Sequence, residues 1–254
     1  MKTRIILCGA CGKMGGNVLS LLENDTEAVA VCGVDLFPKE IGIPVYKSFS
    51  DVKEEADVIV DFSSAENVKE RLEYAKAHKL GIVLASTGFT AKDLALIDEY
   101  AKSVPIFKTA NLSLGVNVLQ ALCKAAATVL GELYDVEIIE KHHNLKKDAP
   151  SGTALMLADT INEVFDGKKK YLGGREGIVG ARDKSEIGIH AVRGGTIVGE
   201  HEVLFAGEDE IITISHSARS KRVFAVGAIR AAKFLNGKPA GRYEMKDLLA
   251  EENN

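Results

Sequence analysis

The sequence predicts an α/β fold in which a parallel sheet layered with helices is combined with a smaller α+β domain on a mixed sheet. Short β-branched runs alternate with helical patterns through the first hundred residues, which is typical of βαβ units. Strand-like runs follow one another later in the chain, and an amphipathic helix at about Val223 to Leu235 is expected to pack back on the first sheet. We therefore expect residues 1–112 and 220–254 to form the first domain and residues 113–219 the second.

The strands expected in the first sheet are short and nearly all apolar, as strands covered on both faces should be. They are Arg4 to Leu7, Val29 to Val34, Asp57 to Phe62, Gly81 to Ala85 and Pro105 to Lys108. Helical patterns fill the gaps between them. An apolar face between Val18 and Leu22 follows the first strand, and Thr90 with Asp93 has the spacing of an N-cap pair that opens another helix.

The second domain is expected to begin with a long helix from about Gly115 to Leu130. A strand at Val136 to Ile139 follows, and a second helix is expected to begin near Ser151. Three later strands and two hairpin turns complete the pattern: Glu186 to Val192, Thr196 to Phe205, Glu210 to Ser215, Gly194-Gly195 and Gly207-Glu208-Asp209. Consecutive hairpins indicate an antiparallel or mixed sheet.

The composition is that of a globular protein, with 46% hydrophobic and 27% charged residues among 254. The net charge of −4 argues against a general nucleic-acid binder, because that role needs a basic face to displace counterions from phosphates. The longest apolar runs fall far below the roughly 20 residues that span a bilayer. Glycines interrupt the first apolar stretch, which argues against a signal peptide. We expect a cytoplasmic protein that binds neither nucleic acid nor membrane.

Four cysteines, Cys8, Cys11, Cys32 and Cys123, lie in or beside expected strands and helices without a regular framework. We expect them to be reduced thiols. Cys8 and Cys11 form a CxxC pair, so a thioredoxin-like redox pair is an alternative, although the motif overlaps a glycine loop. One CxxC alone cannot supply a zinc site.

A glycine-rich loop directly follows the first strand and precedes an apolar helix. It reads Gly9-Ala10-Cys11-Gly12-Lys13-Met14-Gly15, a GxxGxxG variant of the dinucleotide fingerprint. Such glycines allow a tight turn and a close approach of backbone N–H groups to a pyrophosphate. Asp35 ends the second strand 20 residues beyond Gly15, where a carboxylate accepts hydrogen bonds from the adenosine ribose. We predict a Rossmann-type nucleotide site here; a strand-to-helix turn without a ligand is the alternative.

Two further loops follow later strands of the same sheet. Because open α/β sheets bind ligands at the carboxyl ends of their strands, we expect both loops to contact the nucleotide. The contact residues are expected to be Ala85, Ser86 and Thr87 in one loop and Thr109, Ala110, Asn111 and Leu112 in the other. Local sequence leaves open an equal alternative, in which Ser86 or Asn111 is a helix cap or turn residue.

The sequence favours NADH weakly over NADPH. Asp35 would repel a 2′-phosphate, and Leu36 and Phe37 follow it in place of an arginine. Lys13 and Lys39 offer partial compensation, so use of both nucleotides stays open.

The stretch from Glu140 to Ala154 holds the densest group of ionisable residues. Two histidines, two nearby lysines and a Ser-Gly-Thr helix start combine general acids with an anion cradle of N–H, hydroxyl and ammonium groups, which suits a dicarboxylate. Adjacent residues of an extended segment point in opposite directions, so His142 and His143 should have different roles. A metal-dependent hydrolase site that includes Asp148 and a solvated loop with incidental charges are the alternatives, but no HExxH pattern is present.

This stretch closely resembles the ExHHxxKxDAPSGTA signature of dihydrodipicolinate reductases, also called 4-hydroxy-tetrahydrodipicolinate reductases. Further matches fall in the order of that family along the whole chain. They are Gly9 to Gly15, Asp61-Phe62-Ser63, Ser86-Thr87-Gly88-Phe89, Ala110-Asn111-Leu112-Ser113, Gly115-Val116-Asn117, Arg175-Glu176-Gly177 and Gly199-Glu200-His201.

The resemblance implies that NADH or NADPH delivers hydride to a cyclic imine dicarboxylate in lysine and diaminopimelate biosynthesis. By position, His142 matches the acid/base histidine and Lys146 the lysine proposed as proton donor. His143, Gly152 and Thr153 match positions that hold the substrate carboxylates. The resemblance also implies two domains that close on their ligands, and a homotetramer assembled through the mixed sheets.

The chain departs from the commonest family pattern at two positions. Leu36 replaces a basic residue found after the acid in some members, which weakens the case for NADPH. Leu112 stands where others carry an aromatic, which affects packing near the nicotinamide. Two competing functions are a noncatalytic nucleotide sensor, which His142 and Lys146 argue against, and a different two-domain dehydrogenase, which the Ser-Gly-Thr cradle argues against.

Overall fold

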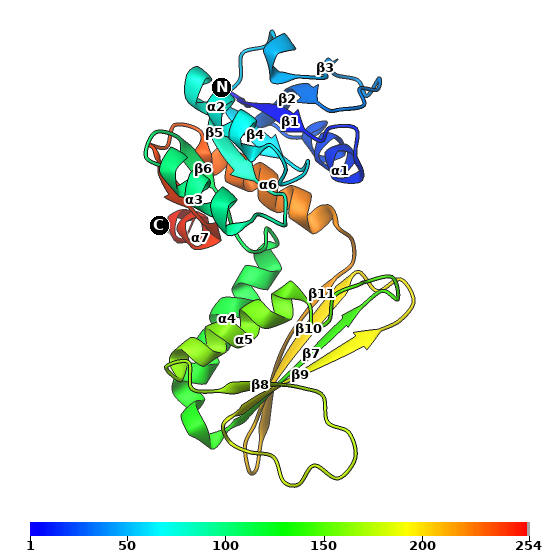
Figure 1. The fold of residues 1–254 in the computed structure, drawn as a ribbon, viewed down its shortest axis with the longest axis vertical. Helices are drawn as coiled ribbons and strands as arrows, with labels where there is room; N and C mark the ends of the chain where they lie inside the picture. Colours follow the sequence, from blue (N-terminus) through cyan, green and yellow to red (C-terminus); the bar gives the residue numbers. More distant parts are fainter. Residues whose placement is uncertain (253–254) are drawn as a thin grey trace. The chain divides into compact units, whose positions relative to one another are not determined.

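The structure is a computed structural model and describes residues 1–252 (Figure 1). The chain forms two compact units. The first contains Met1–Ser113 together with the described residues from Arg222 onward, and the second is Leu114–Lys221. Each unit has its own sheet, and each has a buried apolar cluster against that sheet.

A seven-stranded parallel sheet forms the centre of the first unit, in the order β12-β6-β5-β4-β1-β2-β3. Its strands are β1 (Thr3–Cys8), β2 (Ala28–Val34), β3 (Val45–Tyr46), β4 (Val58–Asp61), β5 (Gly81–Leu84), β6 (Pro105–Phe107) and β12 (Gly241–Tyr243). From β1 the chain runs outward to β2 and β3 on one side, and through β4, β5 and β6 on the other. This reversal of strand order is where open α/β sheets bind ligands.

Helices cover both faces of this sheet. They are α1 (Lys13–Leu22), α2 (Val68–His78), α3 (Ala91–Tyr100), α6 (Arg222–Leu235) and α7 (Met245–Glu252). Successive strand residues point to opposite faces. In β5, Ile82 and Leu84 pack in the cluster that contains the buried residues of α2 and α3, whereas Gly81 lies against Leu235 of α6. The α/β class predicted from the alternating pattern is confirmed.

Local signals account for where several of these elements begin. Thr90 caps α3 through a capping box: its Oγ1 accepts from the Asp93 N–H (3.2 Å), and Asp93 Oδ2 accepts from the Thr90 N–H (2.8 Å). The predicted N-cap pair is confirmed. The sequence prediction missed β3, β12 and α7, which are too short or too weakly patterned to stand out from a loop.

The second unit is built on a five-stranded mixed sheet in the order β11-β10-β7-β9-β8. Its strands are β7 (Asp135–His142), β8 (Lys170–Gly173), β9 (Glu186–Arg193), β10 (Gly199–Ala206) and β11 (Ile211–Ala218). Strand β10 is antiparallel to β7 and β11, whereas β9 is parallel to β7 and β8. The predicted mixed sheet is confirmed, and β8 was not foreseen.

One of the two predicted hairpins is wrong. Gly207 and Glu210 close a tight turn between β10 and β11, with the Gly207 N–H donating to the Glu210 carbonyl (2.9 Å), as expected. Gly194 and Gly195 do not join paired strands, because β9 and β10 lie on opposite sides of β7. Strand β7 occupies the centre of the sheet, a placement that the spacing of glycines cannot reveal.

Two helices, α4 (Leu114–Leu130) and α5 (Gly152–Val164), pack side by side on one face of this sheet (Figure 1). A 3₁₀ turn at Gly131–Leu133 follows α4, and a similar turn at Phe49–Asp51 lies in the first unit. Under the helices the strands contribute apolar residues such as Ile138, Val203 and Phe205. Alternation along β7 and β10 continues this buried face into Glu140 and His201, so the apolar core gives way to a polar group at one end.

Among the described residues, one helical segment is long and apolar enough to cross a membrane by length and composition alone, Leu114–Leu133. The sequence predicts a long helix from about Gly115 to Leu130 here, but not a membrane span. One side of α4 packs into the second unit through Leu119, Cys123 and Ala127, whereas Val118 and Val129 on the other side are exposed.

The turn from β1 into α1 depends on a glycine at position 15. A Cβ placed on Gly15 would lie 2.3 Å from the Ala10 carbonyl oxygen, closer than real Cβ contacts, whereas a Cβ on Gly16 would meet nothing within 4 Å. Backbone atoms cannot yield as a flexible side chain can, so the helix would have to move away from the loop.

We predict that Gly15→Ala lowers the free energy of unfolding by about 2 kcal/mol or more, because overpacking against backbone forces a local shift. Gly16→Ala, one residue along the same helix, is the matched control and should raise stability by about 0.5 kcal/mol through helix propensity. Urea denaturation of both variants measures the difference. Equal effects of the two substitutions would contradict the close packing described here.

Candidate active site

The glycine loop between β1 and α1 has the backbone that a phosphate site requires. Gly9 has φ of +72°, a conformation that side chains rarely adopt, and a Cβ there would lie 3.0 Å from the Phe62 backbone. Gly12 is the N-cap of α1 and has no side chain with which to cap the helix. No side chain in the described part of the chain caps the N-terminus of α1, so its first backbone N–H groups present the positive end of the helix dipole, which favours an anion.

Asp35 follows β2 and is tied directly to the glycine loop. Its Oδ2 accepts from the Cys11 N–H (3.0 Å), and its Oδ1 accepts from the Phe37 N–H (3.0 Å). Asp35 and the glycine loop, which the sequence assigns to the same nucleotide site, are therefore in direct contact. The carboxylate both orders the loop and places an acceptor beside it, where a ribose hydroxyl of a nucleotide would lie.

A cavity of about 320 Å³ lies beside Asp35 in the first unit. Its lining includes Gly9 and Asp35, together with residues that the sequence analysis did not assign to the site: Leu36, Phe37, Lys47, Ser48, Ser63, Ser64, Asn67 and Arg71. Arg71 is buried and pairs through Nε with the buried Asp61 Oδ2 (2.9 Å). It also donates to the carbonyl oxygens of Ser64 and Glu66 (2.5 and 2.8 Å), so it shapes the loop after β4.

The two later loops follow β5 and β6, which are parallel neighbours, so both lie at the same edge of the sheet as the glycine loop. Ala85, which begins the first of them, donates its N–H to the Asp61 carbonyl oxygen (2.9 Å). Asn111 Oδ1 accepts from the Ser113 N–H (2.8 Å), so this asparagine is a turn residue, as one of the two interpretations required. The Asn111 side chain thus stabilises a turn, and the backbone of the same loop can still contact the nucleotide.

In the second unit, the polar group at the end of β7 is centred on Glu140. Its side chain is fully buried and accepts hydrogen bonds from His142 Nδ1 (2.6 Å), Arg193 (2.7 Å from each terminal nitrogen) and the Ser151 N–H (3.0 Å). Burial would raise the pKa of the Glu140 carboxyl, but hydrogen bonds from Arg193 and His142 hold that pKa below its ordinary value. Glu140 is thus a carboxylate that fixes the ring of His142.

His201 of β10 joins the same group from the neighbouring strand. Its Nε2 lies 2.9 Å from Ser151 Oγ, and its ring meets that of His142 edge to face with the centroids 5.3 Å apart. Burial, with a smaller effect of the nearby His142, lowers the pKa of His201 to about 4, so its ring is neutral near neutral pH. Neither His201 nor Arg193 was assigned to the site from the sequence, although His201 stands in a matched family motif.

The remaining predicted residues lie on the loop and helix that follow β7. His143 has a buried Nδ1 without a hydrogen-bond partner among the described residues, and Lys146 Nζ pairs with Asp148 Oδ1 (2.9 Å). Ser151 is the N-cap of α5, and Gly152 and Thr153 form its first turn. A Cβ on Gly152 would meet nothing within 4 Å, so the helix start is open. An unpartnered ring nitrogen and an open helix N-terminus fit an anionic ligand.

Three alternatives came from the sequence: a redox pair of cysteines, a metal site and a solvated loop. All four cysteines are free thiols, and Cys8 is buried. Within residues 1–252 no group of three or more His, Cys, Asp or Glu side chains is arranged to hold a metal ion. Glu140 fixes His142 and the Ser151 N–H, whereas the loop charges between them, such as the Lys146–Asp148 pair, are partly or largely exposed to solvent.

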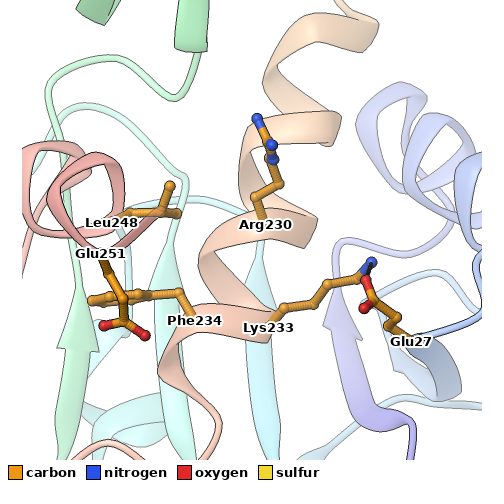
Figure 2. A pocket seen from close by; sticks show the side chains of 6 residues that line it. All are labelled: Glu27, Arg230, Lys233, Phe234, Leu248 and Glu251. Atoms are coloured by element: carbon orange, nitrogen blue, oxygen red, sulfur yellow. Dashed lines mark hydrogen bonds and ion pairs between the residues drawn. The ribbon is translucent and has the colours of Figure 1, made fainter. Parts of the chain in front are cut away.

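A second cavity of about 320 Å³ lies on the first unit between α6, α7 and the start of β2 (Figure 2). Its charged side chains already have partners: Lys233 Nζ pairs with Asp25 (2.8 Å) and Glu27 (2.9 Å), and Glu251 pairs with Lys238. It lies at the amino end of β2, away from the glycine loop at the carboxyl end of β1. This cavity offers no unpaired charge from those residues to a ligand.

Comparison with known proteins decides the family. The model of the dihydrodipicolinate reductase N-terminus matches residues 3–112, and that of the C-terminus matches residues 115–249. The chain belongs to the dihydrodipicolinate reductase family. The family assigned from the sequence signature is confirmed, and with it the pyridine-nucleotide cofactor that the N-terminal domain of this family implies.

Several relatives of known name cover the whole chain. A 4-hydroxy-tetrahydrodipicolinate reductase of Caldanaerobacter subterraneus is 52% identical over 249 residues, which cover 98% of this chain and 99% of the relative. One from Clostridium novyi is 44% identical over 252 residues, covering 99% and 100%. A solved dipicolinate-bound dihydrodipicolinate reductase from Paenisporosarcina sp. TG-14 superposes with a TM-score of 0.80 at 26% identity, covering 96% of this chain and 98% of that one.

The Ser151 hydroxyl has two partners, the Ala154 N–H that it caps (3.1 Å) and His201 Nε2. We predict that Ser151→Ala lowers the free energy of unfolding by about 2 kcal/mol. About 1 kcal/mol comes from the lost helix cap, and about 1 kcal/mol from the buried His201 ring, which loses its hydrogen-bond partner. In a His201→Phe background the same change should cost only the cap, about 1 kcal/mol. Urea denaturation across this double-mutant cycle measures the coupling, and a coupling of zero would mean that the histidine and serine do not interact.

Proposed function

We propose that this chain is a 4-hydroxy-tetrahydrodipicolinate reductase, which uses a reduced pyridine nucleotide to reduce a cyclic dicarboxylate in lysine and diaminopimelate biosynthesis. The observation that carries the proposal is the Glu140–His142 pair beside the open N-terminus of α5. It combines an oriented acid/base with an anion cradle, and the chain also holds a dinucleotide loop. A nucleotide sensor without catalysis would have no use for such a pair.

The hydride for the substrate ring comes from reduced nicotinamide when the cofactor is bound. The first unit would hold that cofactor through the glycine loop Gly9 to Met14, through Asp35, and through the loops at 85–87 and 109–112. In this role the start of α1 meets the pyrophosphate, and Asp35 accepts from the ribose hydroxyls.

The second unit would hold the substrate by its carboxylates. Gly152 and Thr153 form the first turn of α5, whose N-terminus favours an anion, and His143 contributes a buried ring nitrogen. Lys146 adds a positive charge on the loop that also carries His143. The backbone N–H of Lys146 donates to the His143 carbonyl oxygen there (3.2 Å). These groups attract a dianion before any reaction takes place, which explains binding and orientation.

Two residues supply proton chemistry in this proposal. His142 acts as the acid/base because Glu140 occupies its Nδ1 and leaves Nε2 to exchange a proton with the substrate. Lys146 serves as a proton donor and stabilises negative charge that develops on the ring as hydride adds. The Lys146 ammonium pairs with the exposed carboxylate of Asp148, and it can exchange that partner for a substrate group.

The assembly expected from the family is a homotetramer in the cytoplasm, formed through the sheets of the second unit. Helices α4 and α5 cover only one face of that sheet. The other face carries charged side chains, among them Glu137 bridged to Arg175 and Arg182. A sheet face without helices is a surface that a second copy can cover.

The first test of the reductase proposal is His142→Gln. We predict that it lowers turnover of 4-hydroxy-tetrahydrodipicolinate by roughly 10²-fold or more and leaves the Kd of the nucleotide nearly unchanged, as loss of a general acid should. Steady-state oxidation of NADH and fluorescence titration of NADH measure the two quantities. His78→Gln, an exposed histidine in α2, serves as the matched control. Parallel loss of nucleotide binding would contradict a role confined to chemistry.

The weak preference for NADH has its own test at Asp35. We predict that Asp35→Ala raises the KM for NADH about tenfold, because a charged acceptor for the ribose and for the Cys11 N–H is lost. The KM for NADPH should rise less or fall, since repulsion of the 2′-phosphate disappears. Glu40→Ala, an exposed acid outside the cavity lining, controls for net charge. An unchanged ratio of the two KM values would rule out Asp35 as the discriminating residue.

A further inference from the structure

The carboxylate of Glu140 is saturated by donors that come from three separate elements. Both oxygens receive a terminal nitrogen of Arg193 in β9 at 2.7 Å. Oε2 also receives His142 Nδ1 from β7, and Oε1 receives the Ser151 N–H at the start of α5. Since the Glu140 side chain is fully buried, solvent cannot replace a missing donor. The geometry of this group is therefore set by the protein alone.

A carboxylate can only accept hydrogen bonds, and this fixes the proton on the histidine ring. The nitrogen of His142 that faces Glu140 must carry hydrogen, so a neutral His142 is the Nδ1–H tautomer and its Nε2 is the free base. Position 199 keeps that base clear, because a Cβ on Gly199 would lie 3.1 Å from Nε2. The ring thus has one nitrogen committed to the protein and one open to chemistry.

Arg193 controls how strongly Glu140 acts on His142. Its two hydrogen bonds share the carboxylate charge, which would otherwise fall on the histidine alone. The same guanidinium donates to the Asp148 carbonyl oxygen (2.8 Å), so it also holds the loop on which Lys146 pairs with Asp148. One arginine therefore touches the supports of both residues to which we assign proton chemistry.

We propose that Glu140 and Arg193 are positioning residues for the reduction: Glu140 selects the tautomer of His142 that presents Nε2, and Arg193 limits the charge that Glu140 imposes on it. The inference rests on the proposed function for its catalytic meaning, but the tautomer is a property of the folded chain itself. The titratable and charged groups around His142 are Glu140 in β7, Arg193 in β9, His201 in β10, His216 in β11, and Lys146 and Asp148 in the following loop.

Glutamine at position 140 would reverse the tautomer. Every partner of the two carboxylate oxygens is a hydrogen-bond donor. The NH₂ group of a glutamine in Glu140→Gln is also a donor, so it would face the donors of one of the two oxygens without accepting from them. If it faces Ser151 and Arg193, it opposes two N–H groups that cannot accept. If it faces His142, the ring can respond by moving its proton to Nε2, although the Arg193 donor on that side is also lost. The tautomer shift is the smaller cost.

The test uses ¹⁵N-histidine NMR on the full chain, in which His142→Gln identifies the signal of His142 among six histidines. In the wild type we expect the Nδ1–H tautomer. In Glu140→Gln we expect the Nε2–H tautomer, because the amide NH₂ group would donate to Nδ1. In Arg193→Met we expect the Nδ1–H tautomer to persist with its Hδ1 resonance shifted downfield, because Glu140 then shares its charge with fewer donors and the His142–Glu140 hydrogen bond strengthens. If that variant fails to fold, Arg193→Lys should give a smaller shift in the same direction.

Glu137→Gln is the matched control for this experiment. Glu137 lies on β7 as well, and it too accepts from arginines and from a histidine, His190 Nε2 (2.6 Å), but on the opposite face of the sheet. This variant should leave the tautomer and the Hδ1 resonance of His142 unchanged. An unchanged His142 tautomer in Glu140→Gln, or an effect of Glu137→Gln equal to that of Glu140→Gln, would overturn the proposal.

Kinetics separate this inference from the proposed function. If the wild type reduces 4-hydroxy-tetrahydrodipicolinate, Glu140→Gln should lower kcat about tenfold or more with the KM for nucleotide unchanged. A wild type that shows the expected tautomers without turnover would overturn the function and keep the positioning role. Normal turnover by the wild type, together with an Nδ1–H tautomer of His142 that persists in Glu140→Gln, would support the proposed function and overturn the positioning role.

Discussion

Burial of one carboxylate organises the polar end of the second unit. Glu140 lies on the face of β7 that elsewhere carries core residues such as Ile138, so its charge has no access to water. A buried anion is costly unless it is fully hydrogen-bonded. Arg193 and Ser151 meet that demand from β9 and from the start of α5, and in doing so they fix the place where the strand, the loop and the helix meet.

The same sheet contains a second cluster that shows what burial adds. Glu137 accepts from Arg175, Arg182 and His190 on the face without helices, and these partners hold its pKa at about 2 despite the opposing effect of burial. There the arginines belong to one long loop and the cluster fastens that loop to the sheet. Both clusters join a glutamate to arginine and histidine, but the Glu140 side chain is fully buried and that of Glu137 is not, and only the Glu140 group adjoins a helix N-terminus, that of α5.

The sequence was sufficient where the determinants are local. The helix after the glycine loop and the helix that begins at Gly152, next to Ser151, depend on residues close together in the chain, and both are present as predicted. Arg193 and His201 were missed because each meets its partner 50 or more residues away, across strands whose order is not encoded by spacing. The hairpin expected at Gly194 failed for the same reason, since β7 lies between β9 and β10.

Transfer of deuterium from a labelled nucleotide to the substrate would show whether this chain carries out the proposed reduction. The chain would be supplied in turn with NADH and NADPH that carry deuterium at the transferable position of the nicotinamide, together with freshly generated 4-hydroxy-tetrahydrodipicolinate, and the product analysed by mass spectrometry. We expect one deuterium per molecule of product with at least one of the two nucleotides, formed only when the protein is present. Binding of the nucleotides without consumption of either, or an unlabelled product with both, would contradict the assignment of this chain as a reductase of that substrate.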